Sequence, residues 1–178
     1  PLKLARIAAL TRLVLPHEGR IAVCVDSIDG ITRLATIMNE SRAASGIATE
    51  INVFIEVNVG HNRCGVEPGA AAVALALEIR KHPALNFAGL QAYHGKAQHL
   101  RTPAERRAAI ADAIKAVTQT RQLIEAEGLK AGLVTGAGTG TVMLEAASGV
   151  YGELQAGSYL FMDADYASNQ RDPGHPKF

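Results

Sequence analysis

A glycine- and threonine-rich run, G-A-G-T-G-T at residues 136–141, is the strongest chemical signal in this sequence of 178 residues. It follows a strand-like stretch, 131–135, and precedes a short helical stretch, 142–148. Glycines allow a backbone to approach a ligand closely, and a helix N-terminus presents unpaired N–H groups with a partial positive charge. Threonine hydroxyls add further donors, so the run predicts a phosphate cradle. Little else in the sequence accounts for three alternating glycines here, and the alternative is a tight strand-to-helix turn that binds nothing.

Two common nucleotide-binding motifs do not fit this run. The dinucleotide fingerprint G-x-G-x-x-G needs a glycine where Thr141 stands, and no Gly-Lys-Ser/Thr follows as in a P-loop. We therefore expect the phosphate of a different kind of ligand.

Chemically active side chains also follow three other strand-like stretches. They lie in N-V-G-H-N-R-C-G (58–65), Y-H-G-K-A-Q-H (93–99) and Q-A-G-S-Y (155–159). Barrels of parallel strands place their active sites at the carboxyl ends of those strands. A phosphate cradle beside Tyr, His and Arg side chains predicts a phosphorylated cofactor that is handled by acid–base groups.

These clusters need a scaffold in which strands and helices alternate, and the sequence has that pattern. Apolar, β-branched stretches predict strands over 20–26, 51–59, 86–93, 131–135 and 153–161. Amphipathic or alanine-rich stretches predict helices over 2–15, 28–44, 67–81, 103–127 and 142–148. Asp26 or Ser27 would cap the second helix, and Thr102 would cap the fourth, which Gly128 ends.

Alternation of this kind predicts an α/β fold with a parallel sheet covered by helices. A closed (β/α)8 TIM-type barrel has eight strands, so five predicted strands indicate an incomplete barrel fragment. An open doubly wound sheet is the alternative.

Composition narrows the range of functions. The formal net charge is +1 and only 4% of the residues are aromatic, so the chain lacks the basic footprint and the stacking platforms of nucleic-acid-binding proteins. No apolar run is long enough for a membrane span. The two cysteines, Cys24 and Cys64, are too few for a disulfide framework, which indicates a reducing compartment and a cytoplasmic protein.

Several stretches of the chain resemble one enzyme family. V-N-V-G-H-N-R-C-G-V (57–66) is similar to the D-T-G-x-x-R-x-G stretch of the fold-type III pyridoxal-phosphate enzymes, the alanine racemase group. Four more resemble the D-threonine aldolase and D-3-hydroxyaspartate aldolase branch of that group: Q-A-Y-H-G-K-A-Q-H (91–99), V-T-G-A-G-T-G-T (134–141), E-A-A-S-G-V-Y-G-E-L-Q-A-G-S-Y (145–159) and F-M-D-A-D-Y (161–166). The resemblance covers residues 2–166, and it implies that the cofactor is pyridoxal 5'-phosphate.

The resemblance implies cofactor-binding roles for seven residues. Tyr93 would stack on the pyridine ring and limit its tilt. Gln155 stands where racemases carry an Arg that faces the pyridine nitrogen, so the electron sink is expected to differ from that of a racemase. The phosphate would be held by Thr139, Gly140, Gly157, Ser158 and Tyr159.

Three further residues receive catalytic roles from the resemblance. Arg63 would face the cofactor O3′ or the substrate carboxylate, because its permanent charge suits either partner. His99 is the candidate acid–base group near the substrate β-hydroxyl, and His94 either shares that duty or shapes the pocket. The residues alone leave other interpretations open: Tyr93 as a half-buried core residue, Arg63 as a strand cap or the partner of a glutamate, and His99 as a solvated side chain. His61 is interpreted as a surface or loop residue.

Two parts of the family's machinery are expected outside this chain. The resemblance places the Schiff-base lysine upstream of the first residue, and Lys96 does not occupy its position. It places a His and an Asp that bind a metal in a C-terminal β-domain, and His175 does not match them. Asp163 and Asp165 also suggest a metal site, but we interpret them as the exit of a strand, with capping duties.

The expected domain organisation follows from this. Residues 1–166 would form the central and C-terminal part of a pyridoxal-phosphate-binding barrel, and residues 167–178 would connect it to the C-terminal β-domain. No metal ligand is then expected in this chain, which alone would be inactive as part of a larger protein.

For that larger protein, the resemblance implies an aldolase that depends on pyridoxal phosphate and a divalent metal. It would cleave D-3-hydroxy-amino acids, D-threonine or D-3-hydroxyaspartate, to glycine and an aldehyde, and it would be a homodimer. Mn²⁺ or Mg²⁺ would suit an oxygen-rich site that polarises a hydroxyl. The alternatives are a D-serine or 3-hydroxy-D-aspartate dehydratase, which releases ammonia, and a non-catalytic pyridoxal-phosphate carrier. Gln155 argues against a racemase.

Overall fold

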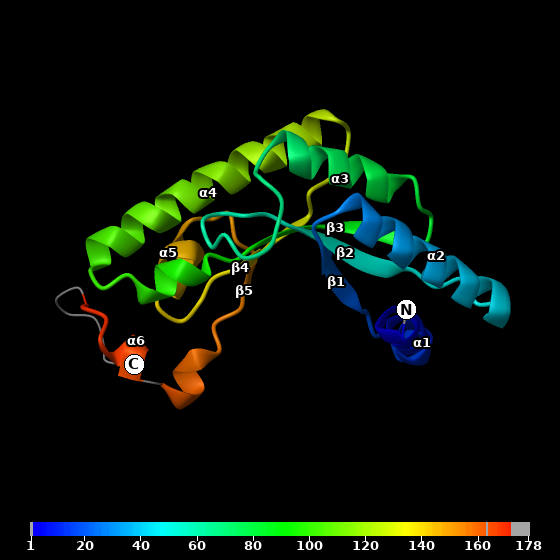
Figure 1. Cartoon of the computed structure of the whole chain (residues 1–178), viewed down its shortest axis with the longest axis horizontal. Helices are drawn as coiled ribbons and strands as arrows, with labels where there is room; N and C mark the ends of the chain where they lie inside the picture. Colours follow the sequence, from blue (N-terminus) through cyan, green and yellow to red (C-terminus); the bar gives the residue numbers. More distant parts are fainter. Residues whose placement is uncertain (1, 163, 172–178) are drawn as a thin grey trace.

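Parallel strands lie side by side in the order of the sequence (Figure 1). The computed structural model describes residues 2–162 and 164–171. Its strands in these ranges are β1 (Ala22–Val25), β2 (Ile51–Glu56), β3 (Leu85–Ala92), β4 (Leu133–Gly136) and β5 (Glu153–Leu154). Each strand pairs in parallel with the next one along the chain, whereas a doubly wound sheet reverses its strand order at a switch point. The prediction of an incomplete (β/α)8 barrel is therefore confirmed.

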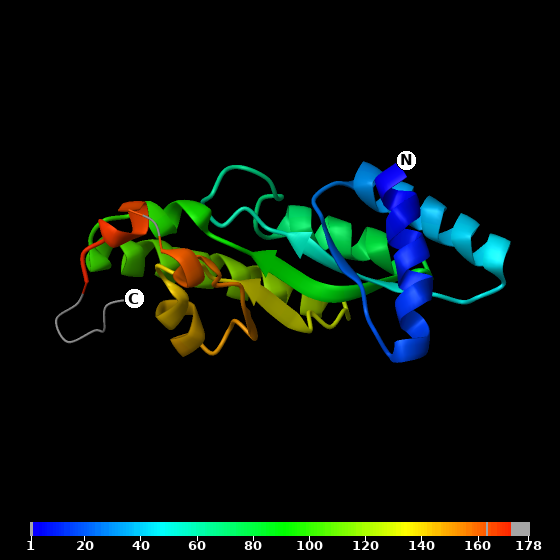
Figure 2. The same cartoon turned by 90° about the horizontal axis from the view of Figure 1, so that it is seen from below.

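Helices connect these strands. The α-helices of the described ranges are α1 (Leu2–Val14), α2 (Ile28–Ser45), α3 (Ala70–Arg80), α4 (Pro103–Ala126), α5 (Val142–Ala147) and α6 (Ala164–Ala167). Short 3-10 turns are η1 (Leu15–His17), η2 (Gly95–His99) and η3 (Ser158–Phe161). Helices α2, α3 and α4 lie on one side of the sheet in Figure 1, and Figure 2 shows the other face, which these three helices leave open.

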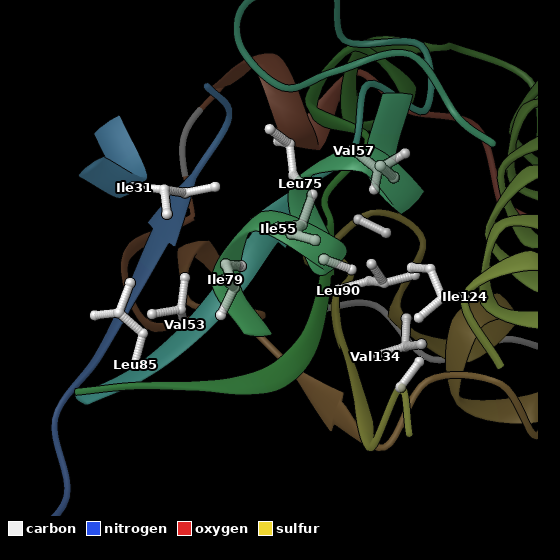
Figure 3. Close-up of a cluster of buried hydrophobic side chains, with 14 of the residues drawn as sticks. Ile31, Val53, Ile55, Val57, Leu75, Ile79, Leu85, Leu90, Ile124 and Val134 are labelled. Atoms are coloured by element: carbon white, nitrogen blue, oxygen red, sulfur yellow. The ribbon is translucent and has the colours of Figure 1, made fainter. Parts of the chain in front are cut away.

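The hydrophobic core lies between the sheet and these helices. Along β2, Ile51, Val53 and Ile55 are fully buried and the residues between them are partly exposed, as the two-residue period of a strand requires. Side chains from neighbouring elements complete the cluster in Figure 3: Ile31, Leu75, Ile79, Leu90, Ile124 and Val134. Burying a side chain of this size contributes roughly 1.5–3 kcal/mol, so the sheet is a firm base for the side chains at its carboxyl edge.

Two predicted helix caps are confirmed. The Ser27 hydroxyl accepts a hydrogen bond from the Gly30 N–H at 3.2 Å at the start of α2. At α4, the Thr102 hydroxyl accepts from the Glu105 N–H at 3.3 Å, and the Glu105 carboxylate accepts from the Thr102 N–H at 2.9 Å. This reciprocal capping box fixes the point at which the chain leaves η2 and enters the long helix α4.

The predicted strand over 153–161 is wrong beyond its first two residues. Strand β4 ends at Gly136, and the last contact with it is the Gln155 N–H donating to the Gly136 carbonyl at 2.7 Å. Without a neighbouring strand the chain turns into η3 instead of extending further. The strand over 51–59 is likewise shorter than predicted, ending at Glu56. The helix over 67–81 begins only at Ala70, after a Pro-Gly pair.

The interpretation of Asp165 as a strand exit is also wrong, because this residue lies in helix α6. Asp163 and His175 lie outside the described residues. Within the described ranges, no helix is both long enough and apolar enough to cross a membrane.

Candidate active site

The predicted clusters meet at the carboxyl edge of the sheet. Tyr93 and His94 directly follow β3, and the ring of Tyr93 contacts His61, from the loop after β2, edge to face, with 6.1 Å between ring centroids. The Tyr159 N–H, after β5, donates to the Thr139 hydroxyl, after β4, at 3.2 Å. The sheet thus brings together groups from loops that follow different strands.

Gln98, on η2, holds the glycine–threonine run in place. Its side chain is 1% exposed, its amide oxygen accepts from the Gly140 N–H at 2.8 Å, and its amide nitrogen donates to the Thr141 hydroxyl at 2.8 Å. A Cβ atom on Gly138 would lie 2.4 Å from the Gln98 Cδ. Close packing against Gln98 therefore accounts for part of the glycine pattern, and the expectation that little besides a ligand accounts for it is wrong.

The buried carboxylate of Glu145 also holds the same run in place. The Thr141 hydroxyl donates to the Glu145 carboxylate at 2.7 Å. Glu145 is 1% exposed, and burial raises the pKa of its carboxyl group, while the hydrogen bond from Thr141 opposes that rise. Gln98, Thr141 and Glu145 thus form a buried chain of hydrogen bonds that fixes the backbone of residues 136–141.

Backbone N–H groups near this run are available for the cradle that the sequence predicts. Among the described residues, the N–H groups of Gly138, Thr139, Gly157 and Ser158 donate to no hydrogen-bond acceptor. A Cβ atom on Gly157 would meet nothing within 4 Å, so the space beside it is open. Such a set of unpaired donors around open space is suited to an anion such as phosphate. Gly140 contributes only its small size, because its N–H already donates to Gln98.

Gln155 lies in a network of side-chain hydrogen bonds at the open face of the sheet. Its amide exchanges two hydrogen bonds with the amide of Gln91, at 2.8 and 3.0 Å, and also donates to the Thr135 hydroxyl at 2.9 Å. Thr135 in turn donates to the Glu153 carboxylate at 2.6 Å. The network holds the Gln155 amide in place, and the role of Gln155 toward a cofactor ring stays a prediction.

Tyr93 and His94 differ in what they can do. Burial is the main cause that raises the pKa of the half-buried Tyr93 phenol, so the group stays neutral and offers the flat face of its ring. His94 is 8% exposed, and burial lowers its pKa, so its ring is neutral as well. A Cβ atom on Gly60 would lie 2.5 Å from the His94 Nε2, so the loop after β2 packs directly on this ring. This packing favours His94 as a residue that shapes the pocket.

The sequence interpretation missed the structural part that His61 plays. The side chain is half-buried, burial is the main cause that lowers its pKa, and a Cβ atom on Gly95 would lie 2.3 Å from its Cε1. His61 therefore packs on Gly95 as His94 packs on Gly60, and the two loops interlock. A glycine next to a histidine in both motifs was the signal that could have indicated this.

His99, by contrast, is exposed and has a carboxylate partner. Its Nδ1 is hydrogen-bonded to the Asp165 carboxylate, and the same carboxylate pairs with the Arg101 guanidinium. His99 is therefore solvent-exposed, as the alternative interpretation expected, but it also has a carboxylate partner. Asp165 was considered from the sequence only as a metal ligand or a strand exit, so its contact with His99 is new.

Arg63 is an exposed cation in the loop after β2. Among the described residues it forms no salt bridge, since the two nearby glutamates have other partners. Glu56 accepts from the Cys64 thiol at 2.9 Å, which raises the pKa of that thiol, and Glu67 accepts from Asn58 at 3.3 Å. The interpretation of Arg63 as the partner of a glutamate is therefore wrong, and its guanidinium is available to an anionic ligand.

No group of three or more His, Cys, Asp or Glu side chains in the described part of the chain is arranged to hold a metal ion. What this edge of the sheet offers is a set of unpaired backbone N–H groups, a flat aromatic ring, an exposed cation and an exposed imidazole. Together they suit a phosphorylated cofactor, an anionic substrate and a proton transfer.

Comparison with known proteins gives consistent matches. The sequence model described as "Alanine racemase, N-terminal domain" matches residues 4–165. A D-threonine aldolase of an Arthrobacter species is 43% identical over 172 residues, which are 97% of this chain and 42% of that protein. A 3-hydroxy-D-aspartate aldolase of Paracoccus denitrificans is 42% identical over 163 residues, 91% of this chain and 40% of that protein.

The fold matches a solved relative equally well. The crystal structure of D-threonine aldolase from Filomicrobium marinum superposes with a TM-score of 0.87 at 44% identity, over 98% of this chain and 45% of that one. The chain therefore spans less than half the length of each of these relatives.

Proposed function

Because this chain belongs to the alanine racemase N-terminal domain family, we propose that the whole protein is an aldolase that cleaves D-3-hydroxy-amino acids to glycine and an aldehyde. The observation that carries this proposal is the identity of 42–43% with relatives named D-threonine aldolase and 3-hydroxy-D-aspartate aldolase, over more than nine tenths of the chain. The preferred substrate is D-threonine or D-3-hydroxyaspartate.

The family implies pyridoxal phosphate, and the residues at the edge of the sheet fit that group. The unpaired N–H groups at 138–139 and 157–158, with the Ser158 and Tyr159 hydroxyls beside them, would hold the phosphate. Tyr93 would lie against the ring. When bound, the cofactor supplies an electron sink for the pair left on Cα when a bond to it breaks.

The chain's own residues bind the substrate and move its proton. Arg63 binds the substrate carboxylate, or the cofactor O3′, through its exposed guanidinium, which forms no salt bridge among the described residues. The Nε2 of His99 accepts the proton of the β-hydroxyl as the Cα–Cβ bond breaks, so the β-carbon leaves as an aldehyde. A proton then returns to Cα, which releases glycine. His94 limits the room around the reacting atoms.

Three further features are part of the proposal. A divalent metal, Mn²⁺ or Mg²⁺, would be held by residues outside this chain, in a domain that follows residues 167–178. The protein would be a homodimer, which sedimentation of the purified full-length protein would measure. It would act in the cytoplasm, where its two cysteines stay reduced.

A product assay on the full-length protein tests the proposal. The protein is supplied with pyridoxal phosphate and Mn²⁺, and D-threonine and D-3-hydroxyaspartate are offered separately, with L-threonine as the control. Equal amounts of glycine and aldehyde from the D-isomers alone are expected. Ammonia with an oxo acid would instead identify a dehydratase. A bound cofactor seen by absorbance without any turnover would identify a carrier.

A further inference from the structure

The C-terminal part of the described chain carries a carboxylate that is hydrogen-bonded to His99. Asp165, in helix α6, contacts the His99 Nδ1 with one carboxylate oxygen and the Arg101 guanidinium with the other. The Arg101 Nη1 also donates to the backbone oxygen of Asp165 at 2.7 Å. Figures 1 and 2 both place α6 beside the start of α4, which follows η2 directly.

The contact does not depend on one pair of side chains. The Asn169 side chain accepts from Arg101 at 2.8 Å and donates to the Gln98 carbonyl at 2.8 Å. The Gln170 N–H donates to the Arg101 carbonyl at 2.8 Å. Residues 164–171 are therefore fixed to η2 at several points, and Asp165 is held where its carboxylate meets the imidazole.

A carboxylate at Nδ1 decides what the other ring nitrogen can do. A neutral imidazole has one N–H, and a carboxylate that accepts it at Nδ1 leaves Nε2 as a free acceptor. The Arg101 cation is the main cause that lowers the pKa of Asp165, with His99 adding to it, so this carboxylate is ionised throughout the neutral range. Its charge also stabilises the imidazolium that forms when Nε2 takes up a proton.

We propose that Asp165 is a positioning residue that holds His99 in the tautomer with a free Nε2 and stabilises its protonated form during the reaction. The proposal rests on the proposed function, in which His99 Nε2 accepts the proton of the β-hydroxyl. Arg101 supports this role, because its guanidinium binds the Asp165 carboxylate oxygen that does not contact His99.

Other charged or titratable groups lie on the elements around His99, and the expected pH dependence includes them. They come from η2 itself, from the connection to α4, from α6 and from the loop after β2: Lys96, Arg101, Asp165, Tyr166 and His61. Asp165 is the only anion at neutral pH in this described set. Its loss leaves an excess of positive charge, which disfavours a protonated His99.

The test compares four variants of the full-length holoenzyme, of which Asp165→Glu restores the charge that Asp165→Asn removes. Asp165→Asn removes the charge at Nδ1, and Arg101→Gln weakens the docking of residues 164–171 but keeps the carboxylate. Asp29→Asn is the matched control, because this carboxylate also pairs with an arginine, Arg33, on the exposed face of α2. The measurements are kcat and KM against pH, and the ¹⁵N chemical shifts of the His99 ring at fixed alkaline pH.

We expect Asp165→Asn to lower kcat for D-threonine cleavage about tenfold or more and to leave KM within about twofold. The acid side of its kcat profile should move to lower pH, and the ring shifts should show a mixture of tautomers. Arg101→Gln should move the profile to higher pH or not at all, Asp165→Glu should recover part of kcat, and Asp29→Asn should match the parent protein.

Two results would overturn the proposal. One is an equal loss of kcat in Asp165→Asn and Arg101→Gln with no shift of either pH profile, which would mean that Asp165 only docks its segment. The other is an unchanged His99 tautomer in Asp165→Asn. The ring shifts need no turnover, so they still test the role of Asp165 if the protein proves not to be an aldolase.

Discussion

Replacing Gln98 with methionine should disorder the proposed phosphate cradle while the rest of the protein stays folded. Methionine has nearly the same length and volume, so the replacement leaves no large cavity. It removes the acceptor of the Gly140 N–H and the donor to the Thr141 hydroxyl, both at 2.8 Å and both in a side chain that is 1% exposed. The partly buried Gly140 N–H is then left without its partner.

The size of the effect follows from these two bonds. A buried polar group that loses its partner costs about 1–3 kcal/mol, and Gly140 and Thr141 are both affected. The free energy of unfolding should therefore fall by about 2–4 kcal/mol. Because the same bonds fix residues 136–141, the N–H groups of Gly138 and Thr139 should lose their fixed positions too, and phosphate binding should weaken about tenfold.

The assay is a titration of the full-length apoprotein with pyridoxal phosphate and, separately, with pyridoxal, which lacks the phosphate. In Gln98→Met the preference for the phosphorylated form should fall about tenfold, while the affinity for pyridoxal stays within about twofold. Gln122→Met, on the exposed face of α4, is the matched control and should change neither value. An unchanged preference in a folded Gln98→Met protein would refute the role that we assign to Gln98.

Three further predictions concern single residues of the site. Gly138→Ala places a Cβ atom against Gln98, so it should lower the cofactor affinity and also lower the free energy of unfolding, by about 1–3 kcal/mol in urea titrations. In Gly157→Ala the added Cβ atom meets open space, so this variant should lower the cofactor affinity alone. Arg63→Gln should raise KM for a D-3-hydroxy-amino acid about tenfold in steady-state assays, since it removes a charged hydrogen-bond donor, and an unchanged KM would exclude a contact with the substrate carboxylate. Burial raises the pKa of Glu145, so the contribution of this group to folding stability is fully present below about pH 4.5 and is lost as pH rises through the folded-state pKa. Glu145→Gln should therefore make the free energy of unfolding decrease less steeply with pH. Parallel curves of unfolding free energy against pH for the variant and the parent protein would contradict this prediction.

The sequence was sufficient to predict most of the helices and strands and the edge of the sheet at which the candidate site residues lie. Local signals determined these: the alternating apolar residues of β2, the Ser27 and Thr102 caps, and polar side chains directly after apolar strands. The strand expected over 153–161 shows where local signals fail. Its residues suit a strand, but a strand also needs a neighbour, and β4 offers none beyond Gly136.

The positioning residues could not be recognised in the same way, because their partners are far away in the sequence. Asp165 lies 66 residues from His99, and Gln98 lies 42 and 43 residues from Gly140 and Thr141. Nothing in the local pattern of a Gln or an Asp indicates which distant backbone it will meet. Only the glycines carried a trace of these contacts, since Gly138 must be small to admit Gln98.

The short turn η2 links the two halves of the site. Gln98 fixes the cradle after β4, and the next residue, His99, is the proposed base, held by a segment that follows β5. A change in the cradle is therefore transmitted to the base through one peptide bond. If this coupling operates, Gln98→Met should disturb the His99 tautomer as well as phosphate binding, whereas Asp165→Asn should disturb the tautomer alone. Measuring the His99 ring shifts and the preference for pyridoxal phosphate in both variants would detect that asymmetry, and equal effects of the two variants on both measurements would contradict it.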